Sequence, residues 1–165
     1  MKIDKLLATK AWAVGLIVLP LLAIAGEELL GKSEMSSRFG QLKVLNTGDQ
    51  QQLFIGKKSM PIKDHFVSIE KIWQIASKDV FLISMASGGS ACPATYAFIV
   101  LESKVASLSD SFGNCSDLPN VERLGNRIVV KFGRRSRDNP AVVVELDDLS
   151  VFEGKKKLKV MPVAF

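Results

Sequence analysis

Residues 80–101 read VFLISMASGGSACPATYAFIVL and contain two nearly continuous apolar runs, Val80–Ala86 and Tyr96–Leu101. Both runs are too short for a typical helix and are apolar on both faces, which is typical of strands at the centre of a sandwich or barrel. The connection Ser87–Ala94 is rich in small residues, so the two strands can pair across it. We expect this pair to form the core of the fold.

Short β-branched and aromatic runs continue on both sides, separated by turn-forming residues. The clearest hairpin joins Val121–Leu124 to Arg127–Phe132 through Gly125-Asn126, a pair able to adopt the positive φ angles of a two-residue turn. Another hairpin is expected between Leu42–Leu45 and Gln52–Ile55. About nine short strands at intervals of roughly 8–12 residues predict an all-β fold, either an antiparallel sandwich or a partly closed barrel.

Other segments are less clear or shorter. Phe66–Ile75 fits both a strand and a helical stripe, and we favour a strand because its neighbours are strands. Further strands are expected at Val142–Leu146, Ser150–Phe152 and Leu158–Val160, with polar loops at 134–140 and 153–157.

The beginning of the chain has the composition of a secretory signal peptide. Three lysines and one aspartate precede an uncharged apolar run, Ala11–Ala25, that ends in Ala23-Ile24-Ala25. The run is shorter than the roughly 20 residues that span a bilayer, and Pro20 interrupts its helical hydrogen bonding. We therefore expect cleavage near Ala25 and a periplasmic protein. The alternative is an uncleaved anchor that holds the protein in the inner membrane, facing the periplasm.

This interpretation fixes the expected domain organisation. Residues 1–25 are the signal peptide or membrane anchor, and residues 26–39 are a flexible lead-in with at most a short helix at Glu27–Leu30. Residues 40–165 then form a single β-rich domain, because a chain of this length and ordinary apolar content builds one core.

Cys92 and Cys115 are the only two cysteines of the chain. In an exported protein an even number of cysteines is expected to pair, so we predict a disulfide; the alternative is two free, buried thiols. The bond is expected to be structural, because a redox pair normally keeps its two cysteines close in sequence. It would place Ser90, Asn114 and Asp117 together on a rigid rim, which is a candidate binding surface.

No catalytic constellation is expected. His65 is the only histidine, and Asp64, its neighbour on an extended segment, would point elsewhere. Gly88–Cys92 lacks the second glycine of a nucleophile elbow, and one histidine with two paired cysteines supplies too few metal ligands. The adjacent acids Asp147 and Asp148 face opposite sides of a strand or lie in a turn. We predict no metal, no cofactor and no catalytic residue.

The charge of the chain limits the classes of partner that we expect. Losing three lysines and one aspartate with residues 1–25 lowers the formal charge from +5 to +3, too little for a dedicated nucleic-acid binder. Two basic clusters lie in predicted loops. If the fold brings them together, they form an anion-binding face for phospholipid head groups, lipopolysaccharide or an acidic protein; the alternative is ordinary charged turns. The clusters contain Arg134, Arg135, Arg137, Lys155, Lys156 and Lys157.

Two short motifs carry a resemblance. GGSACPATY at 88–96 and FGNCSD at 112–117 resemble a pattern, GGxACPAxY followed by FGxCSD, of uncharacterised exported proteins of Gram-negative bacteria. The similarity extends over roughly residues 39–132. It implies an envelope location and a β-rich domain, and it implies no activity.

These observations favour an exported binding, inhibitor or immunity-type module without enzymatic activity, whose partner is another envelope or secreted protein. One alternative is an envelope hydrolase. Another is a membrane-tethered component of a secretion or conjugation apparatus, which requires that the N-terminal segment is retained. Contact with the membrane is expected only in that case.

Overall fold

The computed structural model describes residues 31–89, 91–103, 105–134, 136–137 and 141–164. The expected signal or anchor segment and the possible helix at 27–30 lie outside these residues. The described residues form fourteen strands and no helix, and every strand pairing is antiparallel. The predicted all-β fold is therefore confirmed.

The strands form three sheets, which we call the N-terminal, middle and C-terminal sheets. The N-terminal sheet contains, in order, β1 (Glu34–Ser37), β2 (Gly40–Asn46), β3 (Gln51–Ile55) and β4 (Lys58–Asp64). The middle sheet contains β14 (Val160–Ala164), β8 (Val105–Ser109), β7 (Thr95–Glu102), β6 (Lys78–Ala86) and β5 (Phe66–Ile75). The C-terminal sheet contains β13 (Lys156–Lys157), β12 (Ser150–Glu153), β11 (Val142–Asp147), β10 (Arg127–Phe132) and β9 (Asn120–Leu124).

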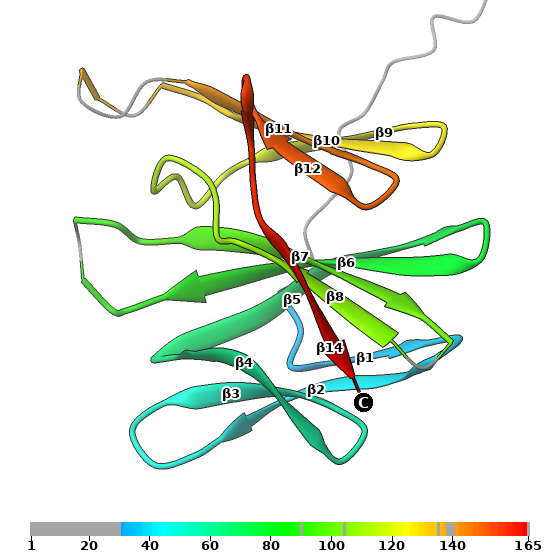
Figure 1. Ribbon diagram of the computed structural model, residues 1–165. Coiled ribbons are helices and arrows are strands. Elements are labelled where there is room, and N and C mark those ends of the chain that lie inside the picture. Colours follow the sequence, from blue (N-terminus) through cyan, green and yellow to red (C-terminus); the bar gives the residue numbers. More distant parts are fainter. Residues whose placement is uncertain (1–30, 90, 104, 135, 138–140, 165) are drawn as a thin grey trace, which may run out of the picture.

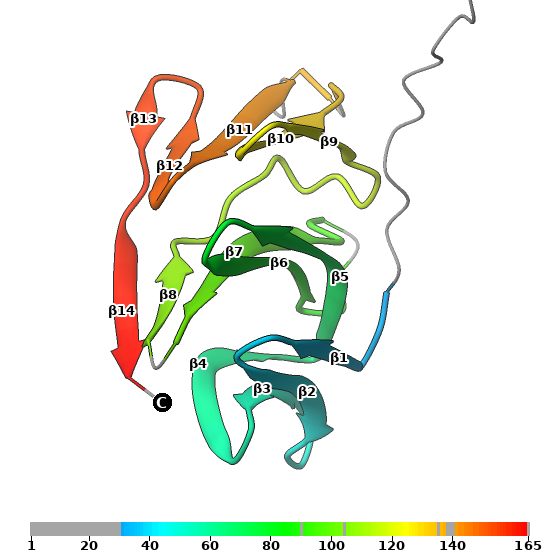
Figure 2. The same cartoon turned by 90° about the vertical axis from the view of Figure 1, so that its right-hand side faces the viewer.

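The sheets are stacked as three layers, with the middle sheet between the other two (Figure 1 and, turned by 90°, Figure 2). The chain passes from the N-terminal sheet to the middle sheet between β4 and β5, which are separated only by His65. At the C-terminal side it leaves the C-terminal sheet after β13 and joins the middle sheet as β14, which pairs with β8. A two-sheet sandwich was one of the expected architectures, and the structure differs from it by having a third sheet.

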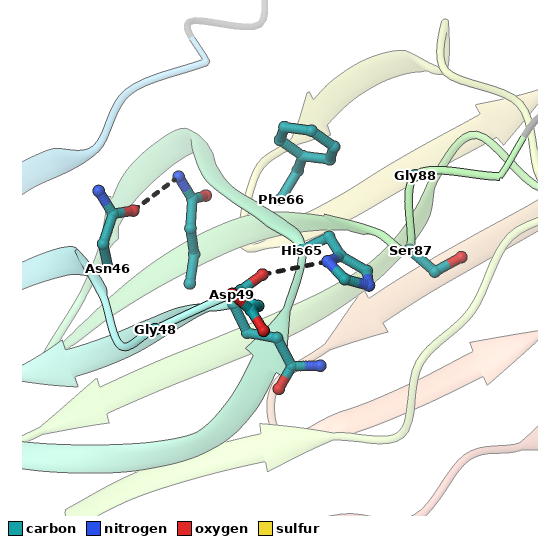
Figure 3. Close-up of a pocket in the computed structure, with 9 residues that line it drawn as sticks. Asn46, Gly48, Asp49, His65, Phe66, Ser87 and Gly88 are labelled. Atoms are coloured by element: carbon teal, nitrogen blue, oxygen red, sulfur yellow. Dashed lines mark hydrogen bonds between the residues drawn. The ribbon is translucent and has the colours of Figure 1, made fainter.

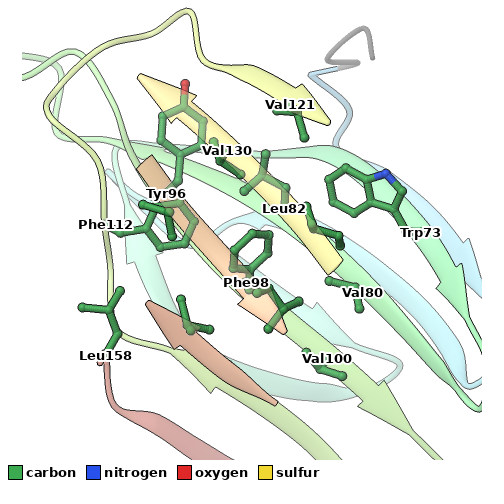
Figure 4. Close-up of a cluster of buried hydrophobic side chains, with 14 of the residues drawn as sticks. Trp73, Val80, Leu82, Tyr96, Phe98, Val100, Phe112, Val121, Val130 and Leu158 are labelled. Carbon is green, nitrogen blue, oxygen red and sulfur yellow. The ribbon is translucent and has the colours of Figure 1, made fainter. Parts of the chain in front are cut away.

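Two separate cores explain why β6 and β7 are apolar on both faces. Leu82 and Phe98 face the C-terminal sheet and pack in one core with Val130 (Figure 4). Phe81 and Ile99 face the N-terminal sheet and belong to the other core. All four are at most 1% exposed. The prediction that these two strands are central is confirmed, and their pairing joins Leu82 to Phe98 and Phe81 to Ile99.

Other expected elements are also present. The hairpin of β9 and β10 has the predicted register around Gly125-Asn126, and β2 pairs with β3. Phe66–Ile75 is strand β5, as we favoured. The register between β5 and β6 shifts between Ile69 and Lys71, where the strand carries a bulge.

Five strands were not predicted, or were predicted differently. β1 lies within the segment expected to be a lead-in, so that expectation was wrong for Glu34–Ser37. No strand was expected at β4 or at β8. Lys156–Lys157 form the short strand β13 instead of a loop, and the last strand, expected at Leu158–Val160, spans Val160–Ala164.

Candidate functional site

Several connections meet at one end of the layered structure, which we call the disulfide end. It carries the described residues of the connections at 46–51, 64–66, 86–95, 110–119 and 132–142, and the β2–β3 turn lies at the left of Figure 1. Loops gathered at one end of a β scaffold are a common location of binding residues, because the sheets hold them in place. The disulfide end is therefore the candidate binding end of the fold.

Cys92 and Cys115 are bonded to each other, as predicted, with Cα atoms 4.6 Å apart and a sequence separation of 23. The bond joins the β6–β7 connection to the connection that follows β8. A bridge between Tyr96 and Phe112 lies next to it: the Tyr96 amide donates to the Phe112 carbonyl over 3.0 Å, and the Phe112 amide donates to the Tyr96 carbonyl over 2.8 Å. The 110–119 connection is thus held to the start of β7 by covalent and hydrogen bonds.

Aromatic rings pack beneath this connection. Tyr96, Phe98 and Phe112 lie together, and the Tyr96 ring centroid is 5.3 Å from that of Phe132 on β10. Burial raises the pKa of Tyr96, and the carboxylates of Glu70 and Asp117 add to this effect. The phenol therefore stays protonated and acts as a packing group, not as an acid or a base, at neutral pH.

Of the predicted rim of Ser90, Asn114 and Asp117, Asn114 is buried. Asn114 is only 6% exposed, and its side-chain Nδ2 donates to the Gly133 carbonyl over 2.8 Å. It therefore fastens the disulfide loop to the β10–β11 connection and offers no surface to a partner. Asp117 is exposed, and Ser90 lies outside the described residues.

The two basic clusters lie at the same end of the C-terminal sheet. Arg134 and Arg137 follow the end of β10, where Phe132 pairs with Val142 at the start of β11. The β12–β13 turn reaches this same end, because the Gly154 amide donates to the Val143 carbonyl over 2.9 Å. Among the described members of both clusters, Arg134, Arg137, Lys155, Lys156 and Lys157 are exposed, and Arg135 lies outside the described residues.

The basic loops are also connected to the disulfide. The carboxylate of Glu153, just before the Lys155 turn, accepts a hydrogen bond of 3.1 Å from the Gly113 amide. With the Asn114–Gly133 contact, both basic loops are linked to the loop that contains Cys115. We call the exposed surface formed by Arg134, Arg137, Lys155, Lys156 and Lys157 the basic face.

His65 lies on the N-terminal side of the disulfide end. Its Nδ1 is 3.1 Å from the Asp49 carbonyl, and the Asp64 carboxylate accepts a hydrogen bond from the His65 amide over 2.8 Å. The Asp64 carboxylate is therefore engaged with the backbone and does not orient the imidazole. The ring borders an open cavity of about 600 Å³ (Figure 3), which sequence reasoning missed. Its lining comes from three separate connections, so no single motif could have indicated it.

The opposite end of the fold holds charges that are mostly structural. Asp79 is fully buried and accepts hydrogen bonds from the backbone amide and the Nε of Arg38. Burial lowers the pKa of Lys78, but its contacts with Asp148 and Glu102 outweigh this, so that the pKa is raised. Asp148 thus serves as a partner of Lys78, and it occupies a turn, as was one of the expectations.

Among residues whose positions are described, no group of three or more His, Cys, Asp or Glu side chains lies close enough to hold a metal ion. In the same part of the chain, no helix has the length and apolar character needed to cross a membrane. No protein-family model matches this sequence, and neither a curated protein nor a solved structure is significantly similar to it.

Proposed function

We propose that this protein is an exported, periplasmic binding module that attaches to an acidic partner protein of the envelope through the basic face. The observation that carries the proposal is that two basic loops, separated by about twenty residues in the sequence, leave the same end of the C-terminal sheet. Complementary charge speeds association and selects the partner.

The disulfide supports the location. A covalent bond between Cys92 and Cys115 persists in an oxidising compartment such as the periplasm and is rare in the cytosol. We propose that residues 1–25 direct export and are removed near Ala25. Intact-mass measurement of the protein isolated from cells tests this: a mass that begins near Gly26 supports it, whereas a full-length, membrane-bound protein contradicts it and favours the anchored alternative.

Hydrogen bonds to the disulfide loop fix the bases of both basic loops, which supports a role in binding. The residues that lead into the two loops, Gly133 and Glu153, are hydrogen-bonded to Asn114 and Gly113 of the disulfide loop, so these two positions are fixed before the partner arrives. Preorganised loops lose less conformational entropy on binding. Such a fixed surface suits an inhibitor or immunity-type protein. We propose binding alone, without a catalysed reaction.

The test compares two charge-reversal variants with the same net change. The first replaces Arg134, Arg137 and Lys155 by Glu on the basic face. The second replaces Lys57, Lys58 and Lys63 by Glu; these residues are also exposed but lie on the β3–β4 turn and β4. Each protein is immobilised and exposed to an envelope extract at increasing salt concentration.

We expect the wild type and the second variant to retain the same protein, with retention falling as salt increases, because exposed charges are screened. The first variant is expected to lose it. Equal retention by both variants, or loss from the second variant alone, would contradict a role of the basic face. Retention that does not depend on salt would contradict its electrostatic basis.

A further inference from the structure

The cavity beside His65 is built from the N-terminal side of the disulfide end and is distinct from the basic face. It has a volume of about 600 Å³ and is open to solvent. The β2–β3 turn, the β4–β5 bend and the β6–β7 connection contribute to it (Figure 3). Its lining consists of Asn46, Gly48, Asp49, Gln50, Gln51, His65, Phe66, Ser87 and Gly88.

One wall of the cavity is an exposed aromatic ring. The Phe66 side chain is 60% exposed, although Val67 and Ile69 on the same strand are buried. Gly88 lies against the ring: a Cβ built at Gly88 would be 3.7 Å from Phe66 Cε2. Because Gly88 has no side chain, the ring is not covered from this direction. A flat apolar surface is thus available to a ligand.

The rest of the lining is polar, and part of it is already oriented. The Gln51 Oε1 accepts a hydrogen bond from the Val67 amide over 2.8 Å, and its Nε2 donates to the Asn46 Oδ1 over 3.3 Å. The Asn46 Nδ2 group therefore has its donors available for a ligand. Because a carbonyl only accepts, the contact with Asp49 places the hydrogen on His65 Nδ1 and leaves Nε2 as an acceptor in the neutral ring.

The charge of the lining restricts the ligand. Asp49 contributes the one carboxylate of the nine lining residues, and none of the nine is a lysine or an arginine. An anionic ligand would meet Asp49 without a compensating cation among them. A purely apolar ligand would bury the amide, hydroxyl and imidazole groups without hydrogen bonds, which is costly.

We propose that this cavity binds a neutral oligosaccharide. A sugar ring presents an apolar C–H face, which matches the Phe66 ring, and hydroxyl edges that both donate and accept hydrogen bonds. The amides of Asn46 and Gln50, the Ser87 hydroxyl and His65 Nε2 supply partners for those edges. The protein would thus hold a glycan and an acidic protein at two parts of the same end.

The experiment adds chitohexaose, maltohexaose or cellohexaose to the complete mature protein. Binding is followed through the backbone amide signals in nuclear magnetic resonance spectra. We expect at least one of them to bind with a dissociation constant of about 1 mM or tighter. The shifted signals should belong to residues 46–51, 65–67 and 87–88. No binding of any of the three, or shifts centred on the basic face, would overturn the proposal.

Two substitutions localise the binding. Phe66→Ala is expected to weaken it about tenfold through lost ring contact, and Asn46→Ala about fivefold through lost hydrogen bonds. Both side chains are exposed, so the thermal midpoint should change little. Leu124→Ala is the matched control, because Leu124 is 53% exposed but lies on β9 in another sheet. Unchanged affinity of Phe66→Ala, or an equal loss in Leu124→Ala, would overturn the proposal.

One further ligand and one further variant distinguish the proposed glycan site from the proposed binding of an acidic protein by the basic face. Trigalacturonate binding more tightly than the neutral sugars would contradict a neutral ligand. The variant with Glu at 134, 137 and 155 should keep its saccharide affinity, whereas Phe66→Ala should keep its retained envelope protein. Loss of saccharide binding in the basic-face variant would contradict a separate glycan site.

Discussion

At the scale of single residues, Gly113 has the most demanding position in the disulfide loop. Its φ is +107°, and a Cβ built on it would lie 3.2 Å and 3.3 Å from two ring carbons of Phe132. The ring cannot retreat easily, because Phe132 is 2% exposed and packs against Tyr96 and Phe112. Glycine is therefore required here both by the backbone conformation and by the close approach of the ring.

Gly113→Ala is expected to reduce the free energy of unfolding by about 3 kcal/mol, from backbone strain and crowding together. Gly125→Ala is the control: its φ is +65°, and no atom lies within 4 Å of its Cβ position. It should cost only about 1 kcal/mol. Urea unfolding followed by circular dichroism measures both. Equal losses would show that the Phe132 contact contributes nothing.

Asn114 shows the limit of sequence reasoning at this scale. Its place between a glycine and a cysteine in a polar stretch indicated an exposed loop residue. Its burial accompanies the entry of Phe112 into the aromatic cluster and the hydrogen bond from its side chain to the Gly133 carbonyl. Neither contact is local in sequence, so the pattern around Asn114 could not predict it. The disulfide was predictable because only two cysteines were available.

At the scale of elements, the β1–β2 turn holds the β5–β6 hairpin in place through Arg38. This arginine donates to the fully buried Asp79 carboxylate over 2.7 Å and to the carbonyls of Ala76 and Lys78. A buried carboxylate is tolerated because its charge is paired and its oxygens accept hydrogen bonds. The N-terminal and middle sheets are thus joined by an ion pair as well as by their shared core.

Arg38→Ala is expected to destabilise the protein by about 3–5 kcal/mol, because it leaves Asp79 buried without its cation. Lys131→Ala removes a partner of Glu122 from an ion pair whose lysine side chain is 46% exposed, and it should cost less than about 1 kcal/mol. Calorimetric thermal unfolding compares the two. Similar midpoints for both variants would refute the structural role of the Arg38–Asp79 pair.

The elements predicted from the sequence are those with strong apolar patterns. β6, β7 and the β9–β10 hairpin are such cases. β1 was missed because its residues, Glu-Met-Ser-Ser, carry almost no β pattern and pair only because β2 provides a template. In β4, Met60 and Ile62 are buried in alternation, but only two apolar positions interrupted by Pro61 form too weak a pattern to predict a strand. Edge strands of this kind depend on their neighbours more than on their own residues.

At the scale of the whole molecule, the disulfide closes a loop that crosses the middle sheet. Residues between Cys92 and Cys115 include β7, which contributes to both cores, and β8, whose buried apolar residues belong to the core against the N-terminal sheet. Restricting the unfolded chain over this separation is worth about 3 kcal/mol in the entropic account. The bond therefore stabilises the layers together with the disulfide end.

Replacing both cysteines by serine is expected to lower the thermal midpoint by about 10 °C, given about 3 kcal/mol lost in a domain of this size. Reductant should lower the wild-type midpoint by a similar amount and leave the double variant unchanged. Differential scanning calorimetry with and without dithiothreitol measures this. A wild-type midpoint that reductant does not alter, in protein whose reduction is verified by thiol labelling, would contradict the prediction.

The architecture as a whole was only partly predictable. Apolar residues on both faces of β6 and β7 indicated a central position, but not whether one or two sheets would cover them. The third layer follows from the bend between β4 and β5 and from the return of β14 to the middle sheet. Both are decided by long-range packing. The same holds for the position of both basic loops at one end of the C-terminal sheet, which the sequence analysis could state only as a condition.

Site-specific photo-crosslinking in cells tests the central claim, that the protein binds its partner through the basic face. A photo-reactive amino acid is placed at Arg137 in one strain and at Lys57, exposed on the β3–β4 turn, in another. We predict a discrete crosslinked adduct to an acidic envelope protein from position 137 and none from position 57. The same adduct from both positions, or an adduct from position 57 alone, would contradict the account.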